Sequence, residues 1–404
     1  MLSWEYPPRI VGGIARHVYG LSRGLAKLGV DVSVFTCEFP GAPREEKLDG
    51  VRIFRVDSYK APTPNLATWD LMMNQSMEEF AAEILSSNSG DPVLLHAHEW
   101  LVAKAAIGLK HTLRLPMMAT IHATEAGRRY VLHDDNERMI DQIEYWLTFE
   151  AWRIICCSRY MTRQVSAQFS LPADKTITIP NGVDVSDFVG TFNKRNFRRE
   201  FASPAEKIVL FVGRLVYEKG AGVLLEAIPR VLQKVNCKVI IGSEGYMKEE
   251  LLAKAKRLGI DQHVVFTGYI DETTLRRLYR VADACAFPSL YEPFGIVALE
   301  AMAAKAPVVV SDVGGFSEIV NDGVNGVKAI PNDAESLAAS IIRVLDDPAY
   351  AENLRANAAK IVQDQYSWNQ IAVLTKIIYE EVLEAYLKGS WRMPQRRSWH
   401  ATGT

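Results

Sequence analysis

Short apolar runs alternate with amphipathic stretches along most of the chain, and a polar segment separates two such series. The stretches between the runs carry apolar residues at helical spacing, as Ile14, Val18, Leu21 and Leu25 do. Continuous apolar runs separated by helices are typical of parallel strands with helices on both faces of the sheet. The first series contains "VDVSVFT", "VRIFRV", "VLLHAH", "MMATIH", "RIICCS" and "TITIP", and the second "KIVLFVG", "CKVIIG", "VVFTGY", "ACAFPS" and "PVVVSD". The sequence therefore predicts an α/β protein with two Rossmann-like, doubly wound domains that face a cleft.

The length of 404 residues exceeds what one ordinary core organises and suits two domains. The polar stretch "GTFNKRNFRREFASPAEK" marks the expected linker. We expect a first domain over residues 1–190, a second over 191–366, a last helix over 367–388 and a disordered tail over 389–404. Because "MLSW" is short for a first strand, we also expect the natural start to lie a few residues upstream.

Composition excludes several classes of protein. The net charge of −2 argues against bulk electrostatic binding to nucleic acid. The 5 cysteines form no C-x-x-C pair and predict buried thiols in a reducing, cytoplasmic setting. No apolar run approaches the roughly 18 residues that a membrane span needs, so we expect no membrane span.

The stretch "EPFGIVALE" carries two glutamates, Glu292 and Glu300, around a predicted strand-to-helix turn. The free N–H groups at the start of that helix, at Phe294, Gly295, Ile296 and Val297, suit a phosphate, and Gly295 allows close approach of another group. Two carboxylates would repel the phosphate itself but could accept hydrogen bonds from hydroxyls on either side of it. A nucleotide sugar has that layout, whereas the simpler interpretation is a helix cap and a surface glutamate.

Two cations follow an earlier predicted strand in "FVGRLVYEKG". Arg214 and Lys219 would lie at the carboxyl edge of the same sheet as Glu292, where they could bind a diphosphate. As a single loop, the segment could equally carry two solvated cations. The pair Gly314 and Gly315 adds a further turn at this edge and is weak evidence alone.

The first domain contributes candidates at its own strand ends. Gly12 and Gly13 open a helix and could contact an anion or a sugar. "HAHEW" ends one strand with His98 and Glu99, and "TIHATE" ends the next with His122. A metal at "HAH" would need a third ligand that the sequence does not fix. The chain has no Asp-x-Asp, so we assign no metal and expect cations to stabilise a leaving diphosphate instead.

Taken together, Glu-x7-Glu, "GRL…KG" and "IPNGVD" resemble the retaining, GT-B-fold glycosyltransferases of family four. "HAHEW" and the first glycine pair also resemble bacterial and archaeal glycogen synthases. The resemblance implies that Glu292 contacts the donor sugar, that Glu300 contacts the ribose, and that Arg214 and Lys219 grip the diphosphate. It further implies that His122 lies near the transferred sugar and that the last helix packs on the first domain.

The implied activity is metal-independent transfer of a hexose with retention, most simply of glucose from ADP-glucose or UDP-glucose to an α-glucan. Gly12, His98 and Glu99 would lie on the acceptor side, and Gly13 on the donor side. Two departures leave the acceptor open: Ile10 stands where glycogen synthases carry a lysine, and Glu99 replaces an aspartate. The alternatives are a lipid, a small metabolite or a surface polysaccharide as acceptor, a sugar-nucleotide 2-epimerase, and a non-catalytic nucleotide-sugar-binding protein. The sequence assigns no oligomeric state.

Overall fold

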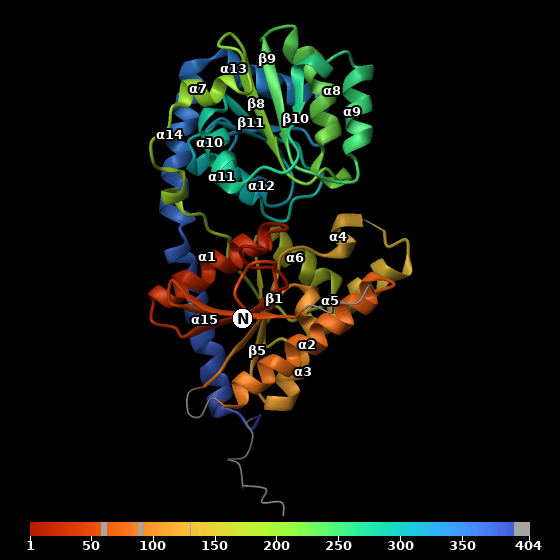
Figure 1. Ribbon diagram of the computed structural model, residues 1–404, viewed down its shortest axis with the longest axis vertical. Coiled ribbons are helices and arrows are strands. Elements are labelled where there is room, and N and C mark those ends of the chain that lie inside the picture. The colour runs from red at the N-terminus through yellow and green to blue at the C-terminus, as the bar shows by residue number, and fades with distance from the viewer. Residues whose placement is uncertain (58–62, 88–91, 130, 392–404) are drawn as a thin grey trace, which may run out of the picture. The chain divides into compact units, whose positions relative to one another are not determined.

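A computed structural model describes residues 1–57, 63–87, 92–129 and 131–391 of the chain (Figure 1). The chain forms two compact units. The first contains Met1–Cys157, Thr162–Ile179 and the chain from Ile371, and the second contains Ser158–Met161 and Pro180–Gln370. Apart from the short Ser158–Met161 segment, the chain passes to the second unit between Ile179 and Pro180, whereas the sequence suggested 190/191. It returns to the first unit between Gln370 and Ile371, whereas the sequence suggested 366/367.

The first unit is built on a mainly parallel sheet in two hydrogen-bonded parts, ordered β1-β3-β2 and β4-β5-β6-β7. Leu2 lies between them and bridges Phe35 of β1 and Ala97 of β4. The Met1–Ser3 segment therefore takes the place of a central first strand, although "MLSW" is short for one. The strands are β1 (Val32–Cys37), β2 (Glu45–Leu48), β3 (Val51–Val56), β4 (Leu95–His98), β5 (Met117–Ile121), β6 (Arg153–Cys156) and β7 (Thr176–Thr178).

Helices follow the strands of the first unit, and the last helix returns to it. Tyr379 of α15 and His96 of β4 form a hydrogen bond of 2.6 Å between the phenol oxygen and the ring Nδ1. Lys376 of the same helix donates to the Leu28 carbonyl at 3.3 Å. The helices are α1 (Gly13–Lys27), α2 (Leu66–Ser86), α3 (Ala103–Leu113), α4 (Glu125–Arg129), α5 (Asp135–Glu150), α6 (Arg159–Gln168) and α15 (Trp368–Lys388).

The second unit has a six-stranded sheet in the order β10-β9-β8-β11-β12-β13. All of its pairings are parallel. Numbered from β8, this is the 3-2-1-4-5-6 order of a doubly wound fold. Successive strands are added on one side of β8 up to β10 and on its other side from β11 onward, so the strand order reverses between β8 and β11. The strands are β8 (Lys207–Val212), β9 (Cys237–Gly242), β10 (Val264–Phe266), β11 (Ala284–Phe287), β12 (Val308–Ser311) and β13 (Val327–Ala329).

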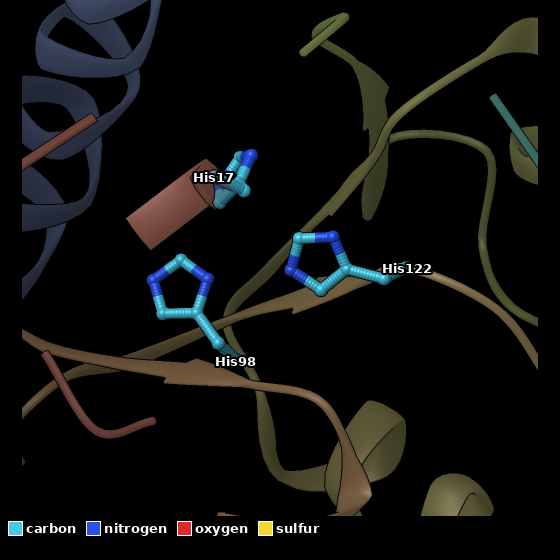
Figure 2. A group of neighbouring side chains, drawn as sticks. All are labelled: His17, His98 and His122. Carbon is cyan, nitrogen blue, oxygen red and sulfur yellow. The ribbon is translucent and has the colours of Figure 1, made fainter. Parts of the chain in front are cut away.

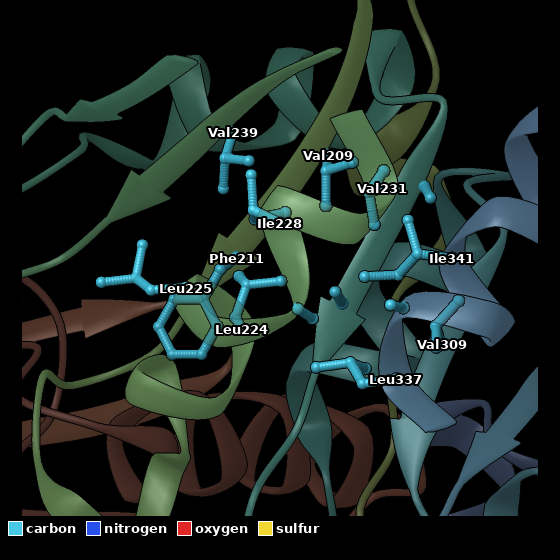
Figure 3. Close-up of a cluster of buried hydrophobic side chains, with 14 of the residues drawn as sticks. Val209, Phe211, Leu224, Leu225, Ile228, Val231, Val239, Val309, Leu337 and Ile341 are labelled. Carbon is cyan, nitrogen blue, oxygen red and sulfur yellow. The ribbon is translucent and has the colours of Figure 1, made fainter. Parts of the chain in front are cut away.

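A buried apolar cluster holds helices α8 and α13 against one face of this sheet (Figure 3). Val209 and Val239 from the strands meet Leu224 and Ile228 of α8 and Ile341 of α13, and all five are fully buried. Side chains of this size each contribute about 1.5–3 kcal/mol when buried. The helices of the unit are α7 (Lys194–Arg199), α8 (Ala221–Leu232), α9 (Lys248–Arg257), α10 (Glu272–Val281), α11 (Ile296–Ala303), α12 (Phe316–Ile319), α13 (Ala334–Asp346) and α14 (Pro348–Gln365).

The stretch expected to hold the linker is structured instead. It contains α7, whose Arg198 donates to the Val281 carbonyl at 2.6 Å and to the Asp283 carboxylate at 2.7 Å. These contacts hold Arg198 in place, whereas most of the other residues of 191–200 are exposed. Most of the expected tail, residues 392–404, lies outside the described residues. Among the helices that the structure describes, none has the length and apolar character of a membrane span.

Candidate active site

The predicted nucleotide-sugar residues gather where the order of the second sheet reverses. β8 and β11 are neighbours, and the loops after them carry "GRLVYEKG" and "PSLYEPFG" at the same carboxyl edge. Ligands of doubly wound proteins usually bind at this position. A small pocket lies here, and Lys219, Ser289, Glu292 and Val297 line it beside Phe287.

Gly220 joins the two loops by close approach of their backbones. A Cβ built at this glycine would lie 1.8 Å from the Pro288 carbonyl oxygen, and its φ of +71° also favours glycine. Beside it, the Leu290 N–H donates to the Glu218 carbonyl at 2.8 Å. The loop with the cations and the loop with the first glutamate therefore form one packed structure.

A third loop, after β12, packs against the glutamate loop. The Gly315 N–H donates to the Glu292 carbonyl at 2.8 Å. A Cβ at Gly315 would lie 2.3 Å from Phe294 Cα, so only glycine fits. The second glycine pair thus fixes the backbone of the Glu292 segment.

Glu292 and Lys219 are direct partners. The Lys219 Nζ donates to the Glu292 carboxylate at 2.8 Å, and the Ser289 hydroxyl donates to the same oxygen at 3.2 Å. Glu292 is 6% exposed, so this charge is largely desolvated and its compensation by Lys219 matters. The sequence predicted both residues for the site but did not predict that they pair.

Arg214 differs from Lys219 in its surroundings. Its side chain is 54% exposed, and its guanidinium lies 3.7 Å from the Glu218 carboxylate. An exposed pair at this distance contributes little to stability. Arg214 can therefore reorient toward an anionic ligand at small cost to the fold.

Glu300 lies on α11 and is buried. Its carboxylate accepts a hydrogen bond of 3.1 Å from the Tyr279 hydroxyl of α10. This tyrosine is itself buried, so the bond fixes the glutamate one turn beyond the start of the helix. The helix begins at Ile296, close to the expected Phe294 or Gly295.

The start of α11 offers backbone donors rather than side chains. Phe294 is buried, and its ring lies 6.3 Å from that of Tyr366. The close neighbour of Gly295 is the Phe316 ring, which lies 2.4 Å from a Cβ built there, so the close approach that the sequence suggested comes from within the chain. The N–H groups of Ile296 and Val297 belong to the first helical turn, where no carbonyl precedes them in the helix.

In the first unit, the residues after β4 and β5 form a second group. His98 and Glu99 are buried, and His122 is half-buried. Glu99 has a φ of 74°, which is uncommon for a residue with a side chain. Burial raises the pKa of Glu99 to about 7, although the Arg128 guanidinium and the backbone N–H groups of His122 and Ala123 oppose the shift.

His17 joins this group, and the sequence analysis did not single it out. It lies on α1, and its ring centroid is 4.6 Å from that of His122 and 5.2 Å from that of His98 (Figure 2). It is 3% exposed and falls on the apolar face that Ile14 and Val18 define. A histidine on the apolar face of a predicted helix was the sequence signal that could have identified His17 as a site residue.

A carboxylate from within the chain occupies the backbone N–H groups at the first glycine pair. The Glu5 carboxylate accepts hydrogen bonds from the N–H groups of Val11 and Gly12, at 2.6 and 2.9 Å. Gly13 begins α1 directly afterwards. A ligand at Gly12 and Gly13 would therefore meet the carboxylate of Glu5, a residue that the sequence analysis did not consider.

Comparison with known proteins identifies the class to which this arrangement belongs. The profile of Glycosyltransferase Family 4 matches residues 11–187, and that of Glycosyl transferases group 1 matches residues 193–361. The chain is 40% identical over 388 residues to an uncharacterised glycosyltransferase of Methanocaldococcus jannaschii, covering 95% of this chain and 98% of that protein.

One enzyme is also similar in sequence, and two enzymes of known structure are similar in fold. A glycogen synthase of Mycobacterium tuberculosis is 36% identical over 94% of this chain and 93% of its own length. The structure of a sucrose-phosphate synthase from Thermosynechococcus elongatus has a TM-score of 0.82 at 27% identity, covering 95% of this chain and 98% of that chain. The catalytic domain of starch synthase IV from Arabidopsis thaliana, bound to ADP and acarbose, shares the fold with a TM-score of 0.76 at 16% identity, covering 95% of this chain and 98% of that one.

The chain belongs to the family-four glycosyltransferases of GT-B fold and is similar to glycogen synthases. The predicted fold class, with two Rossmann-like parallel sheets, is confirmed.

Proposed function

We propose that this glycosyltransferase moves glucose from ADP-glucose or UDP-glucose to an α-glucan, with retention of configuration and without a metal ion. The observation that carries the proposal is the packed edge at β8 and β11, where Lys219, Glu292 and Glu300 surround the start of α11. The similarity to a glycogen synthase over nearly the whole chain supports the glucan acceptor.

Each part of a nucleotide sugar has a matching group at this edge. The Glu292 carboxylate accepts hydrogen bonds from sugar hydroxyls, since one of its oxygens is held by Lys219 and Ser289 and the other has none of these bonds. The backbone N–H groups at Gly295, Ile296 and Val297 bind the diphosphate. Glu300, which Tyr279 orients, accepts from the ribose.

The two cations act on the leaving group. Negative charge grows on the diphosphate as its bond to the sugar breaks, and donors aimed there lower the barrier. Lys219 is fixed beside the donor site, whereas the exposed Arg214 is free to turn toward the phosphates. Because these cations take the role that a metal has in other transferases, EDTA should leave turnover intact.

The family resemblance implies retention, and the groups assigned to the sugar favour attack from the face that the diphosphate leaves. A covalent intermediate would need a carboxylate beneath the ring, and Glu292 is committed to Lys219 and to sugar hydroxyls. The acceptor hydroxyl would then attack on the face from which the diphosphate departs, with a phosphate oxygen taking its proton. His122 orients the sugar, and His98, Glu99 and Gly12 belong to the acceptor side.

A second candidate keeps the reaction and changes the acceptor to a lipid, a small metabolite or a surface polysaccharide. The observation that favours it is Arg9, the cation nearest in sequence to the missing lysine. Its guanidinium lies 5.1 Å from the centroid of the Trp4 ring, so it is held by that ring. Ile10 and Glu99 are further departures on the same side.

The test is a panel of nucleotide sugars scored for nucleotide release with and without glycogen. Release from ADP-glucose or UDP-glucose that rises with glycogen, and that persists in EDTA, supports the first candidate. Release that is indifferent to glycogen supports the second. Loss of turnover in EDTA, restored by magnesium or manganese, would contradict the metal-independent mechanism.

A further inference from the structure

Three histidines from different elements bring ring nitrogens to one point in the first unit. His17 comes from α1, His98 ends β4, and His122 follows β5 (Figure 2). One ring nitrogen of each lies within 4.8 Å of the other two. Binding a sugar hydroxyl needs one such nitrogen, and convergence of three is the arrangement that a metal ion requires.

Two of these rings have nitrogens that lack a hydrogen-bond partner among the described residues. They are both nitrogens of His98, which is fully buried, and Nε2 of His122. Buried polar atoms are nearly always satisfied, and a native exception requires an explanation such as an ion.

His96 holds the position of the His98 ring from behind. Its own ring hydrogen-bonds to the Tyr379 hydroxyl at 2.6 Å and to the Thr120 hydroxyl at 2.7 Å. The centroids of His96 and His98 lie 4.1 Å apart. His96 is therefore a satisfied core histidine, and its packing restricts His98 to a few orientations.

From this geometry we infer a transition-metal site of three imidazole ligands at His17, His98 and His122, selective for Zn²⁺, Co²⁺, Ni²⁺ or Cu²⁺ over Mg²⁺ and Ca²⁺. Imidazole suits the former ions, whereas the latter need oxygen ligands. Three protein ligands leave a fourth position for water, and the half-buried His122 gives access from the outside.

The present spacing is wider than a bound ion requires. Zinc–nitrogen bonds of about 2.0–2.1 Å in a tetrahedral site place ligand nitrogens roughly 3.4 Å apart. From an upper limit of 4.8 Å, small rotations of the rings bring them to that spacing. The Arg128 guanidinium, which also lies in this region, has its charge balanced by Glu125 at 3.1 Å and Glu99 at 3.8 Å.

An ion at this site would occupy His122 and His98 and should therefore inhibit transfer. This consequence rests on the roles proposed above for the two residues, whereas the existence of the site does not. The ion is thus an inhibitor of the reaction and not a participant in it.

The test uses the full chain freed of metal and titrated with Co²⁺, which gives strong visible absorption when four-coordinate. We expect saturation at one equivalent, loss of the signal on adding Zn²⁺, and no effect of excess Mg²⁺. His17→Ala and His122→Ala should each weaken Co²⁺ binding more than about tenfold, because second-shell changes alone cost 10–100-fold. His111→Ala, which alters a histidine that is half-exposed on α3, is the matched control and should bind as the wild type does.

Circular dichroism and thermal melts establish that each variant is folded, and the half-buried His122 is the replacement least expected to disturb the core. The inference is overturned if the wild type shows no saturable site at one equivalent. It is equally overturned if folded His17→Ala and His122→Ala variants bind Co²⁺ as tightly as the control. Tight binding that leaves nucleotide release unchanged would confirm the site and contradict the proposed placement of the reaction at His122.

Discussion

Replacing Glu300 separates its proposed ribose contact from its structural contact. The buried carboxylate accepts a hydrogen bond of 3.1 Å from Tyr279 and, in our proposal, accepts others from the ribose hydroxyls. Hydrogen bonds to a charged group contribute about 1.5–3 kcal/mol. At about 1.4 kcal/mol per factor of ten, Glu300→Ala should weaken the binding of a free nucleoside diphosphate about tenfold to a hundredfold.

The assay is titration calorimetry with ADP and with UDP. Glu300→Ala also leaves the buried Tyr279 hydroxyl without this acceptor, at a cost of about 1–3 kcal/mol in unfolding free energy, so thermal melts must accompany it. Tyr279→Phe is the control, because it removes the structural bond and keeps the carboxylate. Nucleotide affinity unchanged in a folded Glu300→Ala variant would refute the ribose contact.

Three further predictions follow from the same structure. Arg214→Ala should lower kcat about 10²–10³-fold, by analogy with loss of an oxyanion donor. Its melting temperature should change little because the side chain is 54% exposed. A change in donor affinity alone would refute the action of Arg214 on the leaving group. Gly220→Ala should destabilise the chain by more than the roughly 1–2 kcal/mol of left-handed backbone strain. Gly259→Ala is the control and should cost only that strain, because Gly259 has a φ of +67° and a Cβ there would meet no atom within 4 Å. Equal denaturant midpoints for the two variants would contradict the close contact of Gly220 with Pro288. Burial raises the pKa of Glu144 well above its usual range, so the folded state binds more protons and this residue lowers wild-type stability as pH rises above the unfolded pKa. Glu144→Gln removes the contribution of this residue, while that of Glu99 remains. The stability advantage of the variant should grow with pH by at most about 1.4 kcal/mol per unit, which melts across pH 5 to 8 would detect.

The sequence predicted the sheets well because most of their strands are mainly apolar. Each of the eleven runs quoted above overlaps a strand of the structure. The sequence analysis did not predict two strands, β2 and β13. The residues of β2 are "EEKL", and three of its four positions are exposed, so an edge strand of this kind has no apolar signal. β13 reads "VKA", so a lysine interrupts its apolar residues and no continuous apolar run marks it.

The proximity of Lys219 and Glu292 was predictable from the sequence, and their direct pairing was not. Glu292, Lys219 and Glu300 follow from motif spacing, but the Lys219–Glu292 ion pair joins residues 73 apart and the Tyr279–Glu300 bond residues 21 apart. Such contacts depend on how loops pack, which local patterns do not encode. The sequence analysis also missed Glu5 and His17 as site residues, because their neighbours at the site come together only when the chain folds.

The most direct measurement of the central claim is proton NMR of the linkage formed from ADP-glucose or UDP-glucose on glycogen, with EDTA present and with labelled glucose followed into the polymer. The account predicts incorporation of label with an α-anomeric signal in the product. A β-anomeric product would contradict the retaining mechanism, and the absence of incorporation from both donors would contradict the α-glucan acceptor.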